Sequence, residues 1–168
     1  MKKLLLVLLA LGLTTQFYAQ IINDGMLPEV EVRATNYKYL NSVDNSEAAV
    51  PVQLLEDMVA KFDVSSSEFY EDESDFYRVY FYIPEGKIVA AYDRDGKILY
   101  TIEKFTNVAV PNEIASSVAE RFPGWKIAKD VYKVNYDVNQ GVRKQYKLVL
   151  KNGKKTIRVK VDEDGVFL

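Results

Sequence analysis

The residues best suited to chemistry are two copies of a four-residue acidic motif. Asp93-Arg94-Asp95-Gly96 and Asp162-Glu163-Asp164-Gly165 both place acids at alternate positions before a glycine, which is how an EF-hand calcium loop begins. No downstream glutamate completes the ligand set, and the flanking residues are typical of strands. Asp-Gly between alternating apolar runs is typical of a hairpin turn, in which the glycine takes a positive φ. We therefore predict two turns and no metal site.

A second acidic group lies between positions 68 and 75. It comprises Glu68, Glu71, Asp72, Glu73 and Asp75, with serines at both ends. Acid–base or metal chemistry needs two carboxylates held at a fixed separation, and nothing in this segment holds them so. We expect a solvated acidic loop. The alternative is a recognition loop that carries Phe69 and Tyr70.

The chain contains neither cysteine nor histidine. These absences exclude Cys and Ser-His-Asp nucleophilic machinery and zinc sites of the usual ligand set. Glycine-rich phosphate-binding signatures are missing as well. We predict that the protein is not an enzyme and uses no cofactor.

The first 20 residues have the pattern of a secretory signal peptide. Met1-Lys2-Lys3 precedes an apolar run, Leu4 to Leu13, that is too short to span a bilayer, and Ala19 follows as a small residue. We expect cleavage after Ala19, although Phe17 stands where a small residue is usual, so a cut a few residues away is the alternative. No cysteine follows the run, which excludes a lipoprotein anchor. The expected location is periplasmic or secreted, without a membrane span.

A stretch of 23 residues occurs twice, as Tyr77–Leu99 and Tyr146–Leu168, and the copies align without a gap. Each follows an amphipathic segment: Leu54 to Phe62 and Ile114 to Phe122 share one apolar spacing, and each segment begins near a proline. The apolar stripe predicted for the first helix is Leu54, Leu55, Met58, Val59 and Phe62. The second copy adds an alternating strand at 131–138, where the first has only an irregular segment at 65–74. A duplicated module is therefore predicted.

These elements predict an α+β fold of two tandem helix-plus-antiparallel-sheet modules whose sheets join, with the helices on one face. The division is a signal peptide at 1–19, an N-terminal arm or linker at 20–48, and a domain at 49–168 with repeats at about 51–105 and 111–168. Within the arm, Leu27–Arg33 alternates like one strand, whereas 41–49 is polar and small like a loop.

Strand alternation indicates a candidate binding face. In the first copy Tyr77, Val79, Phe81, Ile88, Ala90 and Tyr92 should face the helices, which exposes Phe76, Arg78, Tyr80, Tyr82, Val89 and Ala91. The second copy exposes mainly Lys and Arg. An aromatic outer face is typical of a contact site. Two alternatives are that the arm or the acidic loop covers it, and that the aromatic residues only stabilise cross-strand pairs.

Charge divides the chain into two halves. Residues 20–110 carry 8 Lys and Arg against 17 Asp and Glu, a balance of −9, and residues 111–168 carry 12 against 7, a balance of +5. Mutual attraction of the packed halves explains this division, and a basic patch for an anionic partner is the alternative. Nucleic acid is not an expected partner, because the exported chain is acidic overall.

The order of these motifs resembles the PepSY-like, or β-lactamase-inhibitor-like, family of exported bacterial proteins. The resemblance covers residues 51–168 and rests on three motifs. These are the last residues of the two helices (Val59–Phe62 and Ala119–Ile127), the strands that begin with Tyr, and the closing Asp-x-Asp-Gly. It implies two modules with joined sheets and binding through the open sheet face. It does not imply a target.

We therefore expect a binding module for a protein or peptide, possessing the candidate contact residues Phe69, Tyr70, Phe76, Arg78, Tyr80, Tyr82 and Val89. The alternative is a carrier of a small ligand or envelope component, which would use a groove between the sheet and the N-terminal arm.

Overall fold

The computed structural model describes residues 35–43, 48–71 and 73–168, which belong to one compact unit, Arg33–Leu168. The predicted signal peptide, the predicted strand Leu27–Arg33 and Asp72 of the acidic loop lie outside the described residues.

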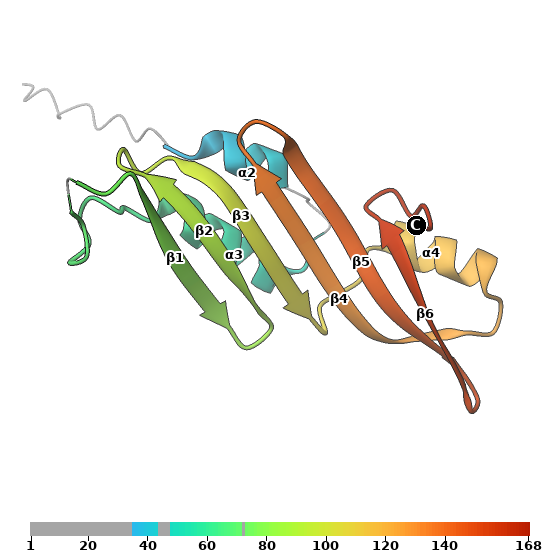
Figure 1. Ribbon diagram of the computed structural model, residues 1–168. Helices are drawn as coiled ribbons and strands as arrows, with labels where there is room; N and C mark the ends of the chain where they lie inside the picture. Colours follow the sequence, from blue (N-terminus) through green and yellow to red (C-terminus); the bar gives the residue numbers. More distant parts are fainter. Residues whose placement is uncertain (1–34, 44–47, 72) are drawn as a thin grey trace, which may run out of the picture. The chain divides into compact units, whose positions relative to one another are not determined.

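One antiparallel sheet dominates the described fold (Figure 1). Its strands are β1 (Phe76–Ile83), β2 (Gly86–Asp93), β3 (Ile98–Thr106), β4 (Lys126–Asp137), β5 (Gly141–Asn152) and β6 (Lys155–Asp162). They lie in chain order, so every strand pairs with its neighbour in sequence. Together with the helices α2 (Tyr37–Val43), α3 (Val50–Lys61) and α4 (Asn112–Arg121) they form a mixed α+β fold that is mostly sheet.

Helix α3 lies where the sequence predicts a helix, and its buried side overlaps the predicted stripe only in part. Pro51 occupies the first turn as expected, yet Leu54 and Met58 of the predicted stripe are exposed. Leu55 and Val59 of the stripe are buried as predicted, and Phe62 packs against the core. Val52, Glu56 and Ala60, which lie outside the stripe, are buried as well. The reason is that α3 packs against two partners, the strands β1 and β2 and the helix α2. The buried arc is therefore shifted around the helix, so that Glu56 and Ala60 replace Leu54 and Met58 on the inner side.

Helix α2 corrects the prediction of a loop from residue 41, because the helix continues to Val43. Tyr39 and Val43 are buried, at spacing i and i+4 on one side of the helix. Just before it, the buried Asn36 joins three segments: its amide nitrogen donates to Ala60 O (3.2 Å) and Gly96 O (3.0 Å), and its oxygen accepts from Ile98 N (2.7 Å). The helix is short and lies beside polar residues, so the sequence gives no clear helical pattern. Tertiary contacts stabilise it instead.

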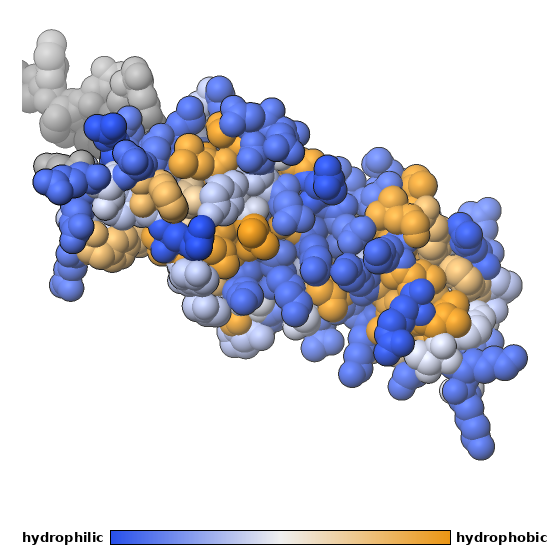
Figure 2. Space-filling view, in the orientation of Figure 1, coloured by the Kyte–Doolittle hydropathy of each residue, from blue (hydrophilic) through white to orange (hydrophobic). Residues whose placement is uncertain are grey.

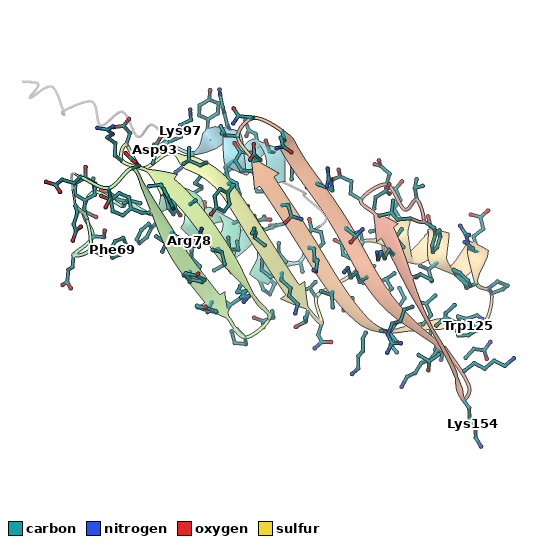
Figure 3. All side chains as sticks on the ribbon, viewed as in Figure 1. Phe69, Arg78, Asp93, Lys97, Trp125 and Lys154 are labelled. Atoms are coloured by element: carbon teal, nitrogen blue, oxygen red, sulfur yellow. The ribbon has the colours of Figure 1, made fainter. Side chains whose placement is uncertain are left out.

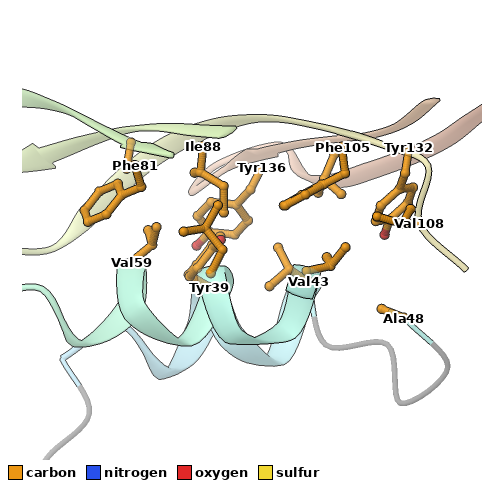
Figure 4. Packing of buried hydrophobic residues seen from close by; sticks show 14 of the residues in the cluster. Tyr39, Val43, Ala48, Val59, Phe81, Ile88, Phe105, Val108, Tyr132 and Tyr136 are labelled. Carbon is orange, nitrogen blue, oxygen red and sulfur yellow. The ribbon is translucent and has the colours of Figure 1, made fainter. Parts of the chain in front are cut away.

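The core lies between the helices and one side of the strands. In Figure 4, Val59, Tyr39 and Val43 from the helices point toward Phe81, Ile88, Phe105 and Tyr136 from the strands. Ile114 and Val118 of α4 belong to the same cluster. The predicted inward residues of the first copy are buried, except Val79, which is half-buried. Alternation therefore predicted the core side of β1 and β2 correctly.

Both Asp-x-Asp-Gly motifs form turns, as predicted. Gly96 and Gly165 have φ of 75° and 78°. The first aspartate closes each turn: Asp93 Oδ1 accepts from the backbone N–H of residues 95 and 97, and Asp162 Oδ1 accepts from residues 164 and 166. These carboxylates therefore stabilise the turns as Asx-type acceptors.

Among the described residues, the helices are all too short or too polar to cross a lipid bilayer.

Candidate binding face

The side of the sheet opposite the core is the candidate binding face, and we call it the open face. Strand register places its residues in rows. Tyr82 of β1 pairs with Lys87 of β2, Tyr80 pairs with Val89, and Arg78 pairs with Ala91. On β3, Ile102 pairs with Val89 and Tyr100 pairs with Ala91. Three consecutive strands therefore place their outward side chains side by side.

An aromatic and apolar surface covers this part of the open face, and we call it the aromatic patch. It consists of Phe76, Arg78, Tyr80, Tyr82, Val89, Tyr100 and Ile102. Four of its members remain largely exposed: Phe76 at 53%, Tyr80 at 51%, Tyr82 at 66% and Ile102 at 54%. Figure 2 shows pale and orange residues over β1–β3 and mostly blue, hydrophilic residues over β4 and β5. Figure 2 also shows orange residues toward β6 and α4. An exposed patch of aromatic and apolar side chains is typical of a contact surface.

The patch has internal order. The rings of Tyr80 and Tyr82 stack with centroids 6.4 Å apart and planes 8° apart. Arg78 Nη2 donates to the hydroxyl oxygen of Tyr100 at 3.0 Å, and this hydrogen bond raises the pKa of the Arg78 guanidinium. The arginine is labelled on β1 in Figure 3. These contacts restrict the rotamers of large side chains before any partner binds, which reduces the entropy cost of binding.

Two small residues of the predicted face are less accessible than expected. Ala91 is completely buried, which corrects its prediction as exposed, because the longer Arg78 and Tyr100 flank it in the same row. Val89 is half-buried between Tyr80 and Ile102 for the same reason. Both residues form the floor of the patch, and the larger side chains around them form its surface.

Phe69 and Tyr70 lie elsewhere. Phe69 is half exposed, but its ring stacks on Phe62 at 6.4 Å, and Tyr70 stacks on Tyr77 at 5.5 Å. Tyr77 points to the core side of β1, and its hydroxyl is hydrogen-bonded to the backbone of Glu71. The acidic loop therefore packs its aromatic residues on the end of the core. The structure separates Phe69 and Tyr70 from the five other predicted contact residues.

Strand β3 adds Tyr100 and Ile102, which the sequence reasoning missed. The orientation of its side chains is unusual: Ile102 is exposed on the open face, whereas the next residue, Glu103, lies on the core side and is 1% exposed. A bulge at the Ala91/Tyr92 step of the β2–β3 pairing sets this register. The exposed isoleucine beside a buried acid is the local inconsistency that often marks a functional surface.

Glu103 lies in a buried polar group under the face. Its Oε1 accepts from the Tyr39 hydroxyl at 2.9 Å and from Thr101 Oγ1 at 2.6 Å, and Glu56 of α3 is buried as well. Burial raises the pKa of Glu103, and burial also raises the pKa of Tyr39 well above its ordinary value. Burial, which disfavours the charged carboxylate, is therefore the cause that favours the neutral form of Glu103. The group joins α2, α3 and β3.

Three hollows between described residues lie away from the aromatic patch. One of about 200 Å³ is lined by residues 35–39, Lys97, Ile98 and Tyr136, and another of about 290 Å³ lies beside Gln53 and Glu56. A third, also about 290 Å³, is lined by Arg121, Phe122, residues 158–160 and the last two residues. Sites for drug-sized ligands usually measure about 300–1,000 Å³. None of these three hollows contains a residue of the aromatic patch.

The chain matches no protein-family model, no curated protein and no solved structure.

Proposed function

We propose that the chain is an exported, non-enzymatic binding module that engages a protein or peptide through the open face of its sheet. The observation that carries the proposal is the aromatic patch, whose Phe76, Tyr80, Tyr82 and Ile102 are each more than half exposed. Tyrosine is favoured at interfaces because it buries a large area and loses little rotamer entropy. Burying such side chains against a partner removes apolar area from water, which is a major favourable term in association.

The proposal includes the PepSY-like organisation: two tandem modules, α3 with β1–β3 and α4 with β4–β6, whose sheets join and whose helices share one face. Its support is the sequence duplication together with the matching Asx-type turns at Asp93 and Asp162. In this organisation β3 pairs with β4 over Tyr100–Thr106 and extends the open face from one module to the other. Export follows from the signal-like first residues.

Capture from a bacterial envelope fraction tests the proposal. Wild-type protein and a Tyr80→Ser/Tyr82→Ser variant are immobilised, and the captured proteins are compared by quantitative mass spectrometry. Because both side chains are exposed, we expect the variant to unfold within about 1 kcal/mol of wild type. A protein partner retained by wild type should be depleted at least tenfold on the variant, which corresponds to roughly 1.4 kcal/mol of lost binding.

Tyr37→Ser is the matched control, because Tyr37 is a similarly exposed tyrosine on α2, 55% exposed. Equal capture by all three proteins would contradict the proposal. Severe destabilisation of the double variant would also contradict it, because it would mean that the two tyrosines are covered core residues.

A further inference from the structure

A group of lysines lies beside the aromatic patch on the open face. Lys87, Lys104 and Lys133 occupy one row across β2, β3 and β4, because Lys87 pairs with Lys104 and Lys104 pairs with Lys133. Lys147 and Lys160 pair across β5 and β6. We call these five residues the lysine cluster. Tyr82 begins the first row on β1, so the cluster and the aromatic patch are continuous.

Like charges directly opposite each other on a sheet are destabilising, and this cluster contains three such pairs. Lys133 and Lys160 carry positive charges that lower the pKa of Lys147, the effect of Lys133 being the largest. Ion pairs between described residues are Lys61 with Asp57 and Lys144 with Glu163, and neither involves the cluster. No ion pair between described residues therefore relieves the repulsion among these lysines.

Three aspartates of the sheet lie at strand ends and accept hydrogen bonds from turns. Asp93 and Asp162 accept the backbone N–H groups of the Asp-x-Asp-Gly turns. Asp137, at the end of β4, accepts from the backbone N–H of Asn139 at 2.8 Å and of Gln140 at 3.1 Å. These carboxylates are therefore engaged at one edge, and the middle of the face stays positive.

We propose that the partner is an acidic protein segment, with carboxylates that lie on the lysine cluster and apolar or aromatic side chains that lie on the aromatic patch. This inference rests on the proposed function and specifies the chemistry of its partner. Charge complementarity relieves the repulsion among the lysines, and the adjoining Tyr80, Tyr82 and Ile102 provide the apolar contacts that most interfaces have at their centre.

The dimensions of the surface favour a chain over a small anion. From β2 to β6 the cluster extends over four strand spacings, about 19 Å at roughly 4.8 Å each, so a single phosphate or carboxylate can contact only part of it. A polysaccharide or a lipid surface could satisfy the charges, but the continuous aromatic and aliphatic row on β1–β3 matches the mixed composition of a protein segment. We therefore favour a polypeptide.

Synthetic polymers test the chemistry directly. Full-length protein is titrated with labelled poly-L-glutamate and with a glutamate–tyrosine copolymer, and binding is followed by fluorescence anisotropy at 50 and 300 mM NaCl. We expect binding that weakens with salt, because the Debye length falls well below about 10 Å in this range. The copolymer should bind more tightly than poly-L-glutamate, because only the copolymer can contact both surfaces.

Two charge-matched variants separate the cluster from net charge. Lys133→Gln/Lys147→Gln removes two central lysines, and Lys154→Gln/Lys155→Gln removes two at the β5–β6 hairpin, where Figure 3 labels Lys154 at the tip. The first variant should bind the copolymer about tenfold more weakly, as expected for losing two exposed ion pairs. The second should bind within about twofold of wild type. Tyr80→Ser/Tyr82→Ser should lose the preference for the copolymer and keep the salt dependence.

Several results would overturn the inference. Equal losses in the two lysine variants would mean that only net charge matters. Lysine-dependent binding of dextran sulfate or of phosphatidylglycerol vesicles, with neither glutamate polymer bound, would identify a polysaccharide or lipid partner instead. An envelope protein lost on Tyr80→Ser/Tyr82→Ser but retained on Lys133→Gln/Lys147→Gln would refute the acidic partner and leave the proposed function standing.

Discussion

Replacing Asn36 by alanine should lower the free energy of unfolding by about 3–4 kcal/mol. The side chain makes three hydrogen bonds, to Ala60 O, Gly96 O and Ile98 N. Each contributes about 1 kcal/mol net, and a buried group left without a partner costs about 1–3 kcal/mol. The bonds to Ala60 and Ile98 are buried, so water cannot replace them. Stability of a typical domain is only about 5–15 kcal/mol, so the loss is large.

Urea denaturation followed by circular dichroism measures this loss. With a slope of about 2 kcal/mol per molar, the midpoint should fall by roughly 2 M. Asn41→Ala is the matched control, because Asn41 lies exposed on α2 and its replacement should shift the midpoint little. Equal midpoints for the two variants would refute this prediction, because they would mean that the hydrogen bonds of Asn36 do not stabilise the packing of α2 against α3 and β3.

Three further predictions concern the core. In urea denaturation, Leu55→Ala should lower the free energy of unfolding by about 2–5 kcal/mol, because Leu55 is buried, whereas the exposed Leu54→Ala should lower it by less than about 1 kcal/mol. Equal losses would contradict the observed orientation of α3. Gly86→Ala should lower the melting temperature, because its Cβ would lie 2.5 Å from Lys104 O, and an overpacked site costs about 1–3 kcal/mol. Burial raises the folded-state pKa of Glu103 above its unfolded value, so the stability contributed by this carboxyl is full below about pH 4.5 and is lost as pH rises through the folded pKa. The melting temperature of Glu103→Gln relative to wild type should therefore increase from pH 4 to pH 8, and a constant difference would show that the group does not titrate as argued.

Local patterns were sufficient to predict much of this fold. Period-two alternation placed Tyr77, Phe81, Ile88 and Tyr92 on the core side, because one face of an antiparallel strand is buried and a one-residue slip would expose all of them. The two Asp-Gly turns were equally readable, since glycine at positive φ is a local requirement. The same alternation located the part of the candidate face that lies on β1 and β2.

Features set by distant segments could not be read in this way. The buried side of α3 depends on its packing against α2. Helix α2 was not predicted, because the residues around Asn41 are polar. Likewise, Ile102 and Glu103 look like an inward apolar residue and an outward acid, and only the bulged pairing with β2 reverses them. Phe69 stays half exposed, but its stacking on Phe62, like that of Tyr70 on Tyr77, depends on segments that local patterns do not bring together.

The chain-order sheet has a consequence for folding. Within β1–β3 and within β4–β6 each pairing closes only a short turn, so these hairpins need little loop-closure entropy. The β3–β4 pairing is different, because the segment between Thr106 and Lys126 contains the whole of α4. We therefore expect the two three-stranded halves to form first and the pairing of β3 with β4, which we call the central seam, to form last. The seam also brings Lys104 beside Lys133, so the mutual repulsion of these two lysines should slow its closure at low ionic strength and weaken as salt is added.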